Sequence, residues 1–197
     1  MGSQLNIDYV SKHIQKSIDI KNEIISDKEL LQKIYDVSNI CLDAFKAGNK
    51  VILAGNGGSA ADSQHIAAEF VSRFRFDRPA LPSISLSTDT SMLTAIGNDY
   101  GYKYLFSRQL QANSKPGDVF IGITTSGNSE NIIEAVGNCK ELGVTSVSLV
   151  GNGGGKMTHL ANHSICVPSQ STEFIQESHI MIGHIICGFV EDSLFTK

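Results

Sequence analysis

Short β-rich runs alternate with segments of helical spacing from about residue 50 to the end of the chain. Five runs are expected to be strands: Val51–Leu53, Ser83–Leu86, Val119–Ile123, Ser146–Val150 and Ile165–Val167. Strands that alternate with helices pair in parallel and are covered by helices on both faces. The sequence therefore predicts the α/β class, with a parallel sheet between two layers of helices.

Helical spacing also marks both ends of the chain. Between Leu5 and Phe45 apolar residues recur at intervals typical of helices, which predicts two helices before the first strand. A long closing helix is expected from about Thr172 to Phe195, with Pro168 as the boundary signal upstream. A length of 197 residues suits one domain. We expect one domain over residues 1–197, whose helical segment 1–48 packs on the core and on partner subunits.

Composition narrows the functional classes. Because no segment approaches the ~20 consecutive apolar residues of a bilayer span and no secretion signal is evident, we expect a cytoplasmic protein without a membrane partner. The net charge of −4 argues against binding to a nucleic-acid backbone, although Arg73, Arg75 and Arg78 leave a local basic patch open. The cysteines form no CxxC pair, which indicates buried thiols: Cys41, Cys139, Cys166 and Cys187.

Loops of small residues follow three of the expected strands, at positions 54–60, 124–129 and 151–155. In an open parallel sheet, ligands bind outside the carboxyl ends of the strands, where such loops gather. The second loop carries hydroxyl groups around Gly127 and precedes a helix that starts near Glu130. Backbone N–H groups and the positive end of that helix can hold a phosphate. The alternative is a polar turn with a helix cap.

The first loop, at positions 54–60, fits no nucleotide motif. It matches neither GxxxxGK[ST] nor GxGxxG, so a nucleotide is not implied. Its glycines permit close approach of the backbone, while Asn56 and Ser59 can face sugar hydroxyls or cap the following helix. The third loop, at positions 151–155, has fewer polar side chains and is expected to be a turn.

Two helices carry candidate metal ligands or acid/base groups. His65 and Glu69 are four residues apart, so both lie on one helical face. On the closing helix, Gln176 and His184 are eight residues apart and about 80° from each other around the axis. Histidine and carboxylate suit zinc and related ions, whereas a Gln oxygen is a less usual ligand. Each residue also has an ordinary structural interpretation, and periodicity does not separate His179 from His184.

Four ordered stretches together resemble the phosphoheptose isomerases, a family with the SIS (sugar isomerase) fold. They are residues 54–65, residues 95–101, residues 125–129, and residues 175–177 with His184. The resemblance implies a three-layer α/β/α SIS domain with N-terminal helices, a long C-terminal helix and five parallel strands in the order 2-1-3-4-5. It also implies a homotetramer with active sites at subunit boundaries.

The resemblance further implies one Zn²⁺ per subunit, and it selects His184 over His179. The implied metal ligands are His65, Glu69, Gln176 and His184. The implied substrate contacts are Asn56, Gly57, Gly58, Asn98, Asp99, Thr124, Thr125, Ser126, Ser129 and Gln176. Many relatives have Ser at position 124, and Thr keeps the hydroxyl.

The implied reaction converts sedoheptulose 7-phosphate into D-glycero-D-manno-heptose 7-phosphate, which feeds heptose into lipopolysaccharide or capsule. A proton must move between C1 and C2 through an enediol. We expect Glu69 to act as the base, His184 as the acid, and the metal as a Lewis acid or template.

Two alternatives belong to the same fold. One is a non-enzymatic SIS regulator of replication initiation, which His184 argues against, because that regulator lacks the final histidine. The other is an isomerase of another sugar phosphate, such as arabinose 5-phosphate or a hexulose phosphate. Such isomerases resemble the chain less in the set His65, Glu69 and Gln176.

Overall fold

The computed structural model describes residues 6–195, beginning with two helices in series. These are α1 (Ile7–Ser26) and α2 (Lys28–Lys46), and Asp27 alone separates them. The Asp27 carboxylate accepts hydrogen bonds from the N–H groups of Glu29 and Leu30, so it caps α2 and fixes the break. The prediction of two helices before the first strand is confirmed.

Five parallel strands form one sheet in the order β2-β1-β3-β4-β5. Their bounds are β1 (Val51–Gly55), β2 (Ser83–Ser85), β3 (Val119–Thr124), β4 (Thr145–Val150) and β5 (His163–Cys166). This confirms the predicted strand order. Since β2 lies on one side of β1 and β3 on the other, the direction of strand addition reverses between β1 and β3. Such a reversal opens a crevice at the carboxyl ends of the strands.

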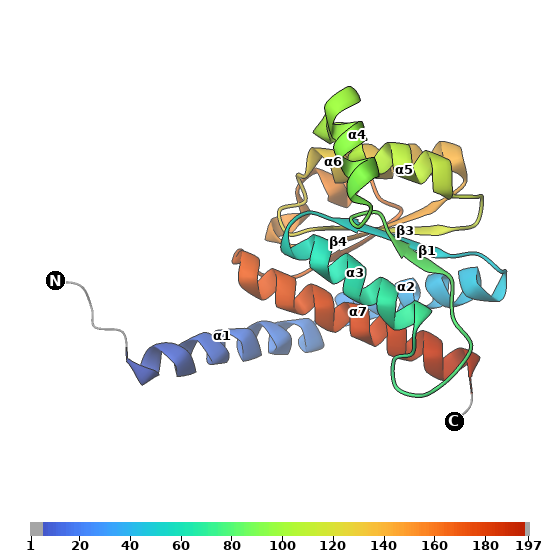
Figure 1. The fold of residues 1–197 in the computed structure, drawn as a ribbon. Coiled ribbons are helices and arrows are strands. Elements are labelled where there is room, and N and C mark those ends of the chain that lie inside the picture. Colours follow the sequence, from blue (N-terminus) through green and yellow to red (C-terminus); the bar gives the residue numbers. More distant parts are fainter. Residues whose placement is uncertain (1–5, 196–197) are drawn as a thin grey trace.

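Helices cover both faces of the sheet (Figure 1). The remaining elements are α3 (Gly58–Val71), α4 (Thr90–Asp99), α5 (Leu105–Asn113), α6 (Glu130–Leu142), α7 (Thr172–Leu194) and two 3₁₀ segments, η1 (Tyr102–Tyr104) and η2 (Asn152–His159). On one face lie α2, α3 and α7, and on the other lie α5 and α6 (Figure 1). Successive residues of β1 enter opposite cores. Leu53 packs on the face covered by α2, α3 and α7, which is the lower face in Figure 1, and Ile52 packs on the upper face, covered by α5 and α6. The predicted α/β/α layers are confirmed.

A buried ion pair closes the amino-terminal edge of the sheet. Asp118 is fully buried, and its carboxylate lies 2.6 Å from the Lys50 ammonium. It also accepts hydrogen bonds from the backbone N–H groups of Lys50 and Lys115. Because residues 50 and 118 precede β1 and β3, this pair fixes the two central strands at the end opposite the small-residue loops.

Helices α3 and α7 make an unusually close contact on the lower face. A Cβ built on Gly183 of α7 would lie 2.5 Å from Cδ1 of Ile66 on α3. Both residues are buried, and each is the immediate neighbour of a candidate ligand, His65 or His184. The absence of a side chain at position 183 therefore brings the two ligand-bearing helices together.

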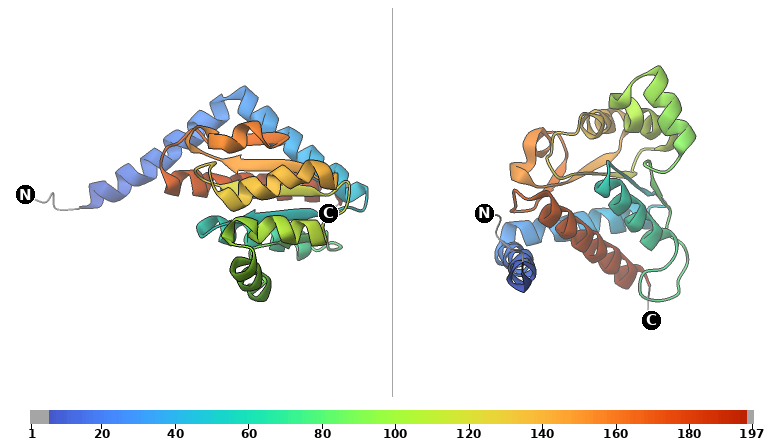
Figure 2. Two further views of the ribbon diagram at one scale, coloured as in Figure 1. Left: turned by 90° about the horizontal axis from the view of Figure 1, so that it is seen from above. Right: turned by 60° about the vertical axis from the view of Figure 1, so that its left-hand side comes forward.

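Helix α1 extends away from the sheet instead of covering it (Figures 1 and 2). Only Ile20 and Ile24 of α1 are buried. Exposed apolar residues follow the rest of the helix: Ile7, Tyr9, Val10, Ile14, Ile18 and Ile25. None of the helices within residues 6–195 combines the length and apolar character that a bilayer span requires.

We expect Gly183→Ala to lower the free energy of unfolding by about 1–3 kcal/mol, because the added methyl group overpacks the contact with Ile66. Gly137→Ala, at an exposed position of α6, is the matched control, since a Cβ there meets nothing within 4 Å. The control should stabilise the protein by about 1 kcal/mol. Urea denaturation measures both. Equal stability of the two variants would show that the close contact imposes no constraint.

His179 on α7 makes stability depend on pH. Its side chain is fully buried, and Nε2 donates to the Val150 carbonyl at 3.0 Å. Burial lowers the pKa of His179 from 6.5 to about 4, although the Val150 bond opposes the shift. Between these values the unfolded chain binds more protons than the folded chain, so stability falls as the pH drops through this window. Between pH 7 and pH 4.5 the wild type should lose about 2–3 kcal/mol more than His179→Gln does. Parallel unfolding curves for the two proteins over this range would contradict the assignment.

Candidate functional site

The loops after β1 and β3 meet where the order of strand addition reverses. Asn56 donates to Oδ1 of Asn131 at 2.9 Å, and Asn131 donates back to Oδ1 of Asn56 at 2.8 Å. Tyr102 donates its hydroxyl hydrogen to the same Asn56 oxygen at 2.8 Å. These bonds fix the predicted sugar-binding residue Asn56 against the first turn of α6. Sequence reasoning missed Asn131 and Tyr102. The one available signal for Asn131 was an amide in the first turn after a hydroxyl-rich loop.

The Thr124–Ser129 loop presents its polar groups at the start of α6. Ser129 precedes the helix, but its hydroxyl lies 2.9 Å from that of Thr124 instead of capping the backbone. No side chain within residues 6–195 caps α6, so its leading N–H groups are available to an anion. Thr125 is half-buried, and Ser126 is exposed. This arrangement fits the predicted phosphate loop better than a capped turn.

The glycine-rich segment after β4 packs against the Thr124–Ser129 loop. Gly127 has φ of 65°, and a Cβ there would overlap the Gly154 carbonyl. Gly151 donates its N–H to the Thr125 carbonyl at 3.1 Å, and Met157 donates to the Gly127 carbonyl at 3.2 Å. The segment was expected to be a turn. The expected turn is present within η2, because Gly153, Gly154 and Gly155 have positive φ and interrupt the helical backbone.

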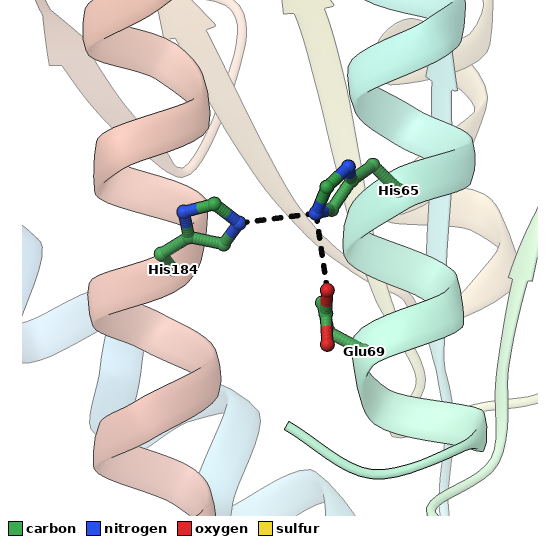
Figure 3. Close-up of side chains that lie close together, drawn as sticks. All are labelled: His65, Glu69 and His184. Atoms are coloured by element: carbon green, nitrogen blue, oxygen red, sulfur yellow. Dashed lines mark hydrogen bonds and ion pairs between the residues drawn. The ribbon is translucent and has the colours of Figure 1, made fainter. Parts of the chain in front are cut away.

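Three candidate ligands converge between α3 and α7 (Figure 3). The His65 Nε2 atom lies 3.0 Å from Oε1 of Glu69 and 3.1 Å from Nε2 of His184. Together these residues offer ligand atoms within 4.8 Å of one another. In a tetrahedral zinc site with bonds of ~2.0–2.2 Å, neighbouring donor atoms lie ~3.3–3.5 Å apart. The donor set and its spacing therefore suit one divalent metal ion.

The surroundings of the cluster hold its side chains in place. The Phe74 ring stacks on the His184 imidazole at 5.5 Å, with 23° between the planes. The His65 side chain is 51% exposed, so the cluster remains open to a ligand from solvent. His184 faces His65, whereas His179 is buried and bonds to the Val150 carbonyl of β4.

Gln176 and Asp62 lie nearer the first turn of α3. The Gln176 side chain packs where a Cβ of Gly58 would lie, so Gly58 is what lets it approach the helix. Asp62 is buried, and Oδ2 has no hydrogen-bond partner within the described part of the chain. Burial raises the pKa of Asp62 to about 6, while the charge of His65 and a bond from Gln176 oppose the shift. Sequence reasoning missed Asp62, although it precedes His65 by three residues and shares its helical face.

The structure does not bring every expected residue to these loops. Asn98 and Asp99 lie at the exposed end of α4, where the Asn98 amide donates to the Asp99 carboxylate at 2.8 Å. Within residues 6–195 no hydrogen bond joins either side chain to the loops after β1 and β3. Helix α4 buries none of its residues and projects from the upper face (Figure 1).

Two of the three arginines that left a local basic patch open, Arg75 and Arg78, are paired with carboxylates. The Arg75 guanidinium lies 2.9 Å from the Asp192 carboxylate. Arg78 is withdrawn from solvent, with 2% of its side chain exposed, and pairs with Glu191 at 3.1 Å. The positive charges of both residues are therefore paired with carboxylates of α7.

Comparison with known proteins identifies the family. The SIS domain model matches residues 12–151. The chain is 62% identical to the phosphoheptose isomerase of Aneurinibacillus thermoaerophilus over 188 residues, which cover 95% of both chains. It is 57% identical to phosphoheptose isomerase 2 of Campylobacter jejuni, over 96% of this chain and 94% of the relative.

Solved structures agree. The phosphoheptose isomerase of Francisella tularensis superposes with a TM-score of 0.91 at 32% identity, covering 96% of this chain and 100% of the other. The phosphoheptose isomerase GmhA of Neisseria gonorrhoeae gives 0.88 at 39% identity, covering 95% and 98%. Matches of this extent include both the loops and the ligand-bearing helices. The chain belongs to the phosphoheptose isomerases of the SIS-domain family.

Proposed function

We propose that this isomerase converts sedoheptulose 7-phosphate into D-glycero-D-manno-heptose 7-phosphate, the first step of bacterial heptose synthesis for lipopolysaccharide or capsule. The observation that carries the proposal is the convergence of His65, Glu69 and His184 from two distant helices, in a chain whose relatives are phosphoheptose isomerases. A non-enzymatic regulator would have no need for this cluster. The extent of identity to named phosphoheptose isomerases disfavours another sugar phosphate.

The substrate phosphate is assigned to the Thr124–Ser129 loop. Hydroxyl groups and the leading N–H groups of α6 are suitable donors to phosphate oxygens. Sugar hydroxyls are assigned to Asn56 and to the backbone of Gly57 and Gly58, with Gln176 beside them. A ketose 7-phosphate has its reacting carbons and its phosphate at opposite ends. It therefore needs separate phosphate and acid/base sites of the kind that these loops and the cluster provide.

The metal ion is proposed to be Zn²⁺, one per subunit, held by His65, Glu69, His184 and Gln176. Imidazole and carboxylate are common zinc ligands, and the three charged or aromatic donors already face one point. When bound, the ion supplies Lewis acidity toward the substrate oxygens. Asp62 lies one turn before His65 and adds a buried carboxylate next to the proposed ligand Gln176.

The protein groups move the protons. Glu69 removes a proton from C1 of the ketose and returns it to C2 of the enediol. One oxygen of Glu69 faces His65, so the other remains available for the transfer (Figure 3). His184 donates a proton from Nδ1 to the C2 oxygen as that carbonyl becomes a hydroxyl, because its Nε2 faces the metal cluster. It then recovers the proton that the C1 hydroxyl loses when the aldehyde forms.

Sedoheptulose 7-phosphate should be converted by the zinc-loaded protein, and removal of the metal with a chelator should abolish most turnover. Added Zn²⁺ should restore it, because the ligands stay in place on folded helices. An NMR assay that follows the aldose product measures this. The absence of aldose from the zinc-loaded protein would refute the proposed substrate.

Glu69→Gln should reduce kcat about 10²–10⁴-fold, because the amide cannot take the proton from C1. Metal content and thermal unfolding are measured in parallel, since the amide oxygen can still face a metal. If the variant keeps its zinc and its fold and turns over at nearly the wild-type rate, Glu69 is not the base.

The functional unit is proposed to be a homotetramer in the cytoplasm. Supporting this are the exposed apolar face of α1 and the isolated position of Asn98 and Asp99, which a neighbouring subunit can bring to a site. Replacing Ile14 and Ile18 of α1 with Asp should shift the protein to smaller species, because both apolar residues are exposed in the single chain. Light scattering coupled to size exclusion measures the mass. A tetramer in the variant, or a monomer in the wild type, would contradict the proposal.

A further inference from the structure

A buried carboxylate at the end of α7 organises the segment that follows α3. Glu191 is fully buried and accepts hydrogen bonds from the N–H groups of Phe74, at 3.0 Å, and Arg75, at 2.8 Å. It also accepts from Nε of Arg78 at 3.1 Å. Burial alone would raise the pKa of Glu191, but these donors outweigh it and lower the pKa. The carboxylate is therefore an ionised anchor for the α3–β2 segment.

The Arg78 guanidinium extends this anchor to the end of α3. It donates to the Glu69 carbonyl at 2.7 Å and to the Phe70 carbonyl at 2.6 Å. Both carbonyls lie in the last turn of a helix that ends at Val71, where carbonyl groups lack partners within the helix. Two further bonds reach the carbonyls of Ser72 and Pro79. Three of these carbonyls face Nη1, which has two hydrogens, so they share its N–H groups. The planar guanidinium still directs separate N–H groups at Glu191 and at the end of α3, which an ammonium does not.

This ion pair connects both helices of the metal cluster. Glu191 lies about two turns after His184 on α7, on a similar face. Arg78 holds the backbone of Glu69, which is itself in the cluster. The segment that Glu191 anchors carries Phe74, whose ring stacks on His184. One buried pair thus contacts α3, α7 and the residue that packs on the imidazole.

We propose that the Arg78–Glu191 ion pair is a positioning element for the metal cluster, which sets the relation of Glu69 to His184 and holds Phe74 against the imidazole. The inference rests on the proposed metal-dependent function. It assigns neither residue a contact with substrate. Its consequence is that metal affinity depends on a pair that offers the ion no ligand.

The test compares two double variants with matched chemistry. Arg78→Met with Glu191→Leu removes both charges together and leaves neither buried alone, which proteins often tolerate. Lys50→Met with Asp118→Leu does the same at the starts of β1 and β3. There, too, a buried carboxylate accepts from two backbone N–H groups and a cation. Melting temperature, zinc Kd by competition with a chelating dye, and the visible spectrum of the Co²⁺-loaded protein are measured for each.

We expect the Arg78/Glu191 variant to raise the zinc Kd about 10–100-fold and to change the Co²⁺ spectrum, as loss of support around a metal ligand does. The Lys50/Asp118 variant should keep the wild-type Kd and spectrum, whatever its melting temperature. An Arg78/Glu191 variant with wild-type Kd and spectrum would overturn the proposal, as would equal Kd losses in both variants.

Single variants cover the case in which the double variant does not fold. Arg78→Lys keeps the charge but loses the several N–H donors that the guanidinium holds in one plane. Phe74→Leu keeps the ion pair but loses the stacking on His184. Each should raise the zinc Kd in a folded protein, and wild-type values in both would overturn the proposal. Lack of turnover on sedoheptulose 7-phosphate, with these Kd losses retained, would refute the proposed substrate while supporting the positioning role.

Discussion

The close contact between α3 and α7 is the constraint on which the site depends. The two helices come from distant parts of the chain, and Gly183 lets Ile66 approach the backbone of α7. Glycine recurs where α3 and α7 meet their neighbours: Gly58 of α3 admits the Gln176 side chain, and Gly188 of α7 leaves room for the Arg75 guanidinium in the segment after α3. Dense packing converts such small-residue positions into fixed distances between helices. The distance of 3.1 Å between the His65 and His184 nitrogens follows from this packing.

Two buried carboxylates fix the fold in the same way. Asp118 joins the starts of β1 and β3, and Glu191 joins the end of α7 to the segment after α3. Each accepts two backbone N–H bonds and faces a cation, Lys50 or Arg78. A buried charge is tolerated when it is paired and fully hydrogen-bonded. One anchor therefore fixes the sheet away from the loops, and the other acts beside the metal cluster.

The sequence predicted the layers, the strand order and the local part of the site. Strand runs and small-residue loops are local patterns, and four-residue spacing places His65 and Glu69 on one face without tertiary knowledge. Choosing His184 over His179 required the family resemblance. Helical periodicity shows that the two histidines lie on different faces of α7, but it does not show which face is turned toward α3. The Arg78–Glu191 pair spans 113 residues, so no local pattern contains it. Asn131 was missed for a related reason, since its role exists only through its pairing with Asn56.

The central claim is that one metal ion lies between α3 and α7 on ligands that distant segments contribute. Diffraction from crystals of the zinc-loaded protein, collected on both sides of the zinc absorption edge, tests this most directly. We expect an anomalous peak within ~2.0–2.2 Å of the His65 and His184 ring nitrogens and a Glu69 oxygen. A zinc peak bonded to other side chains, or no peak between these helices, would contradict the account.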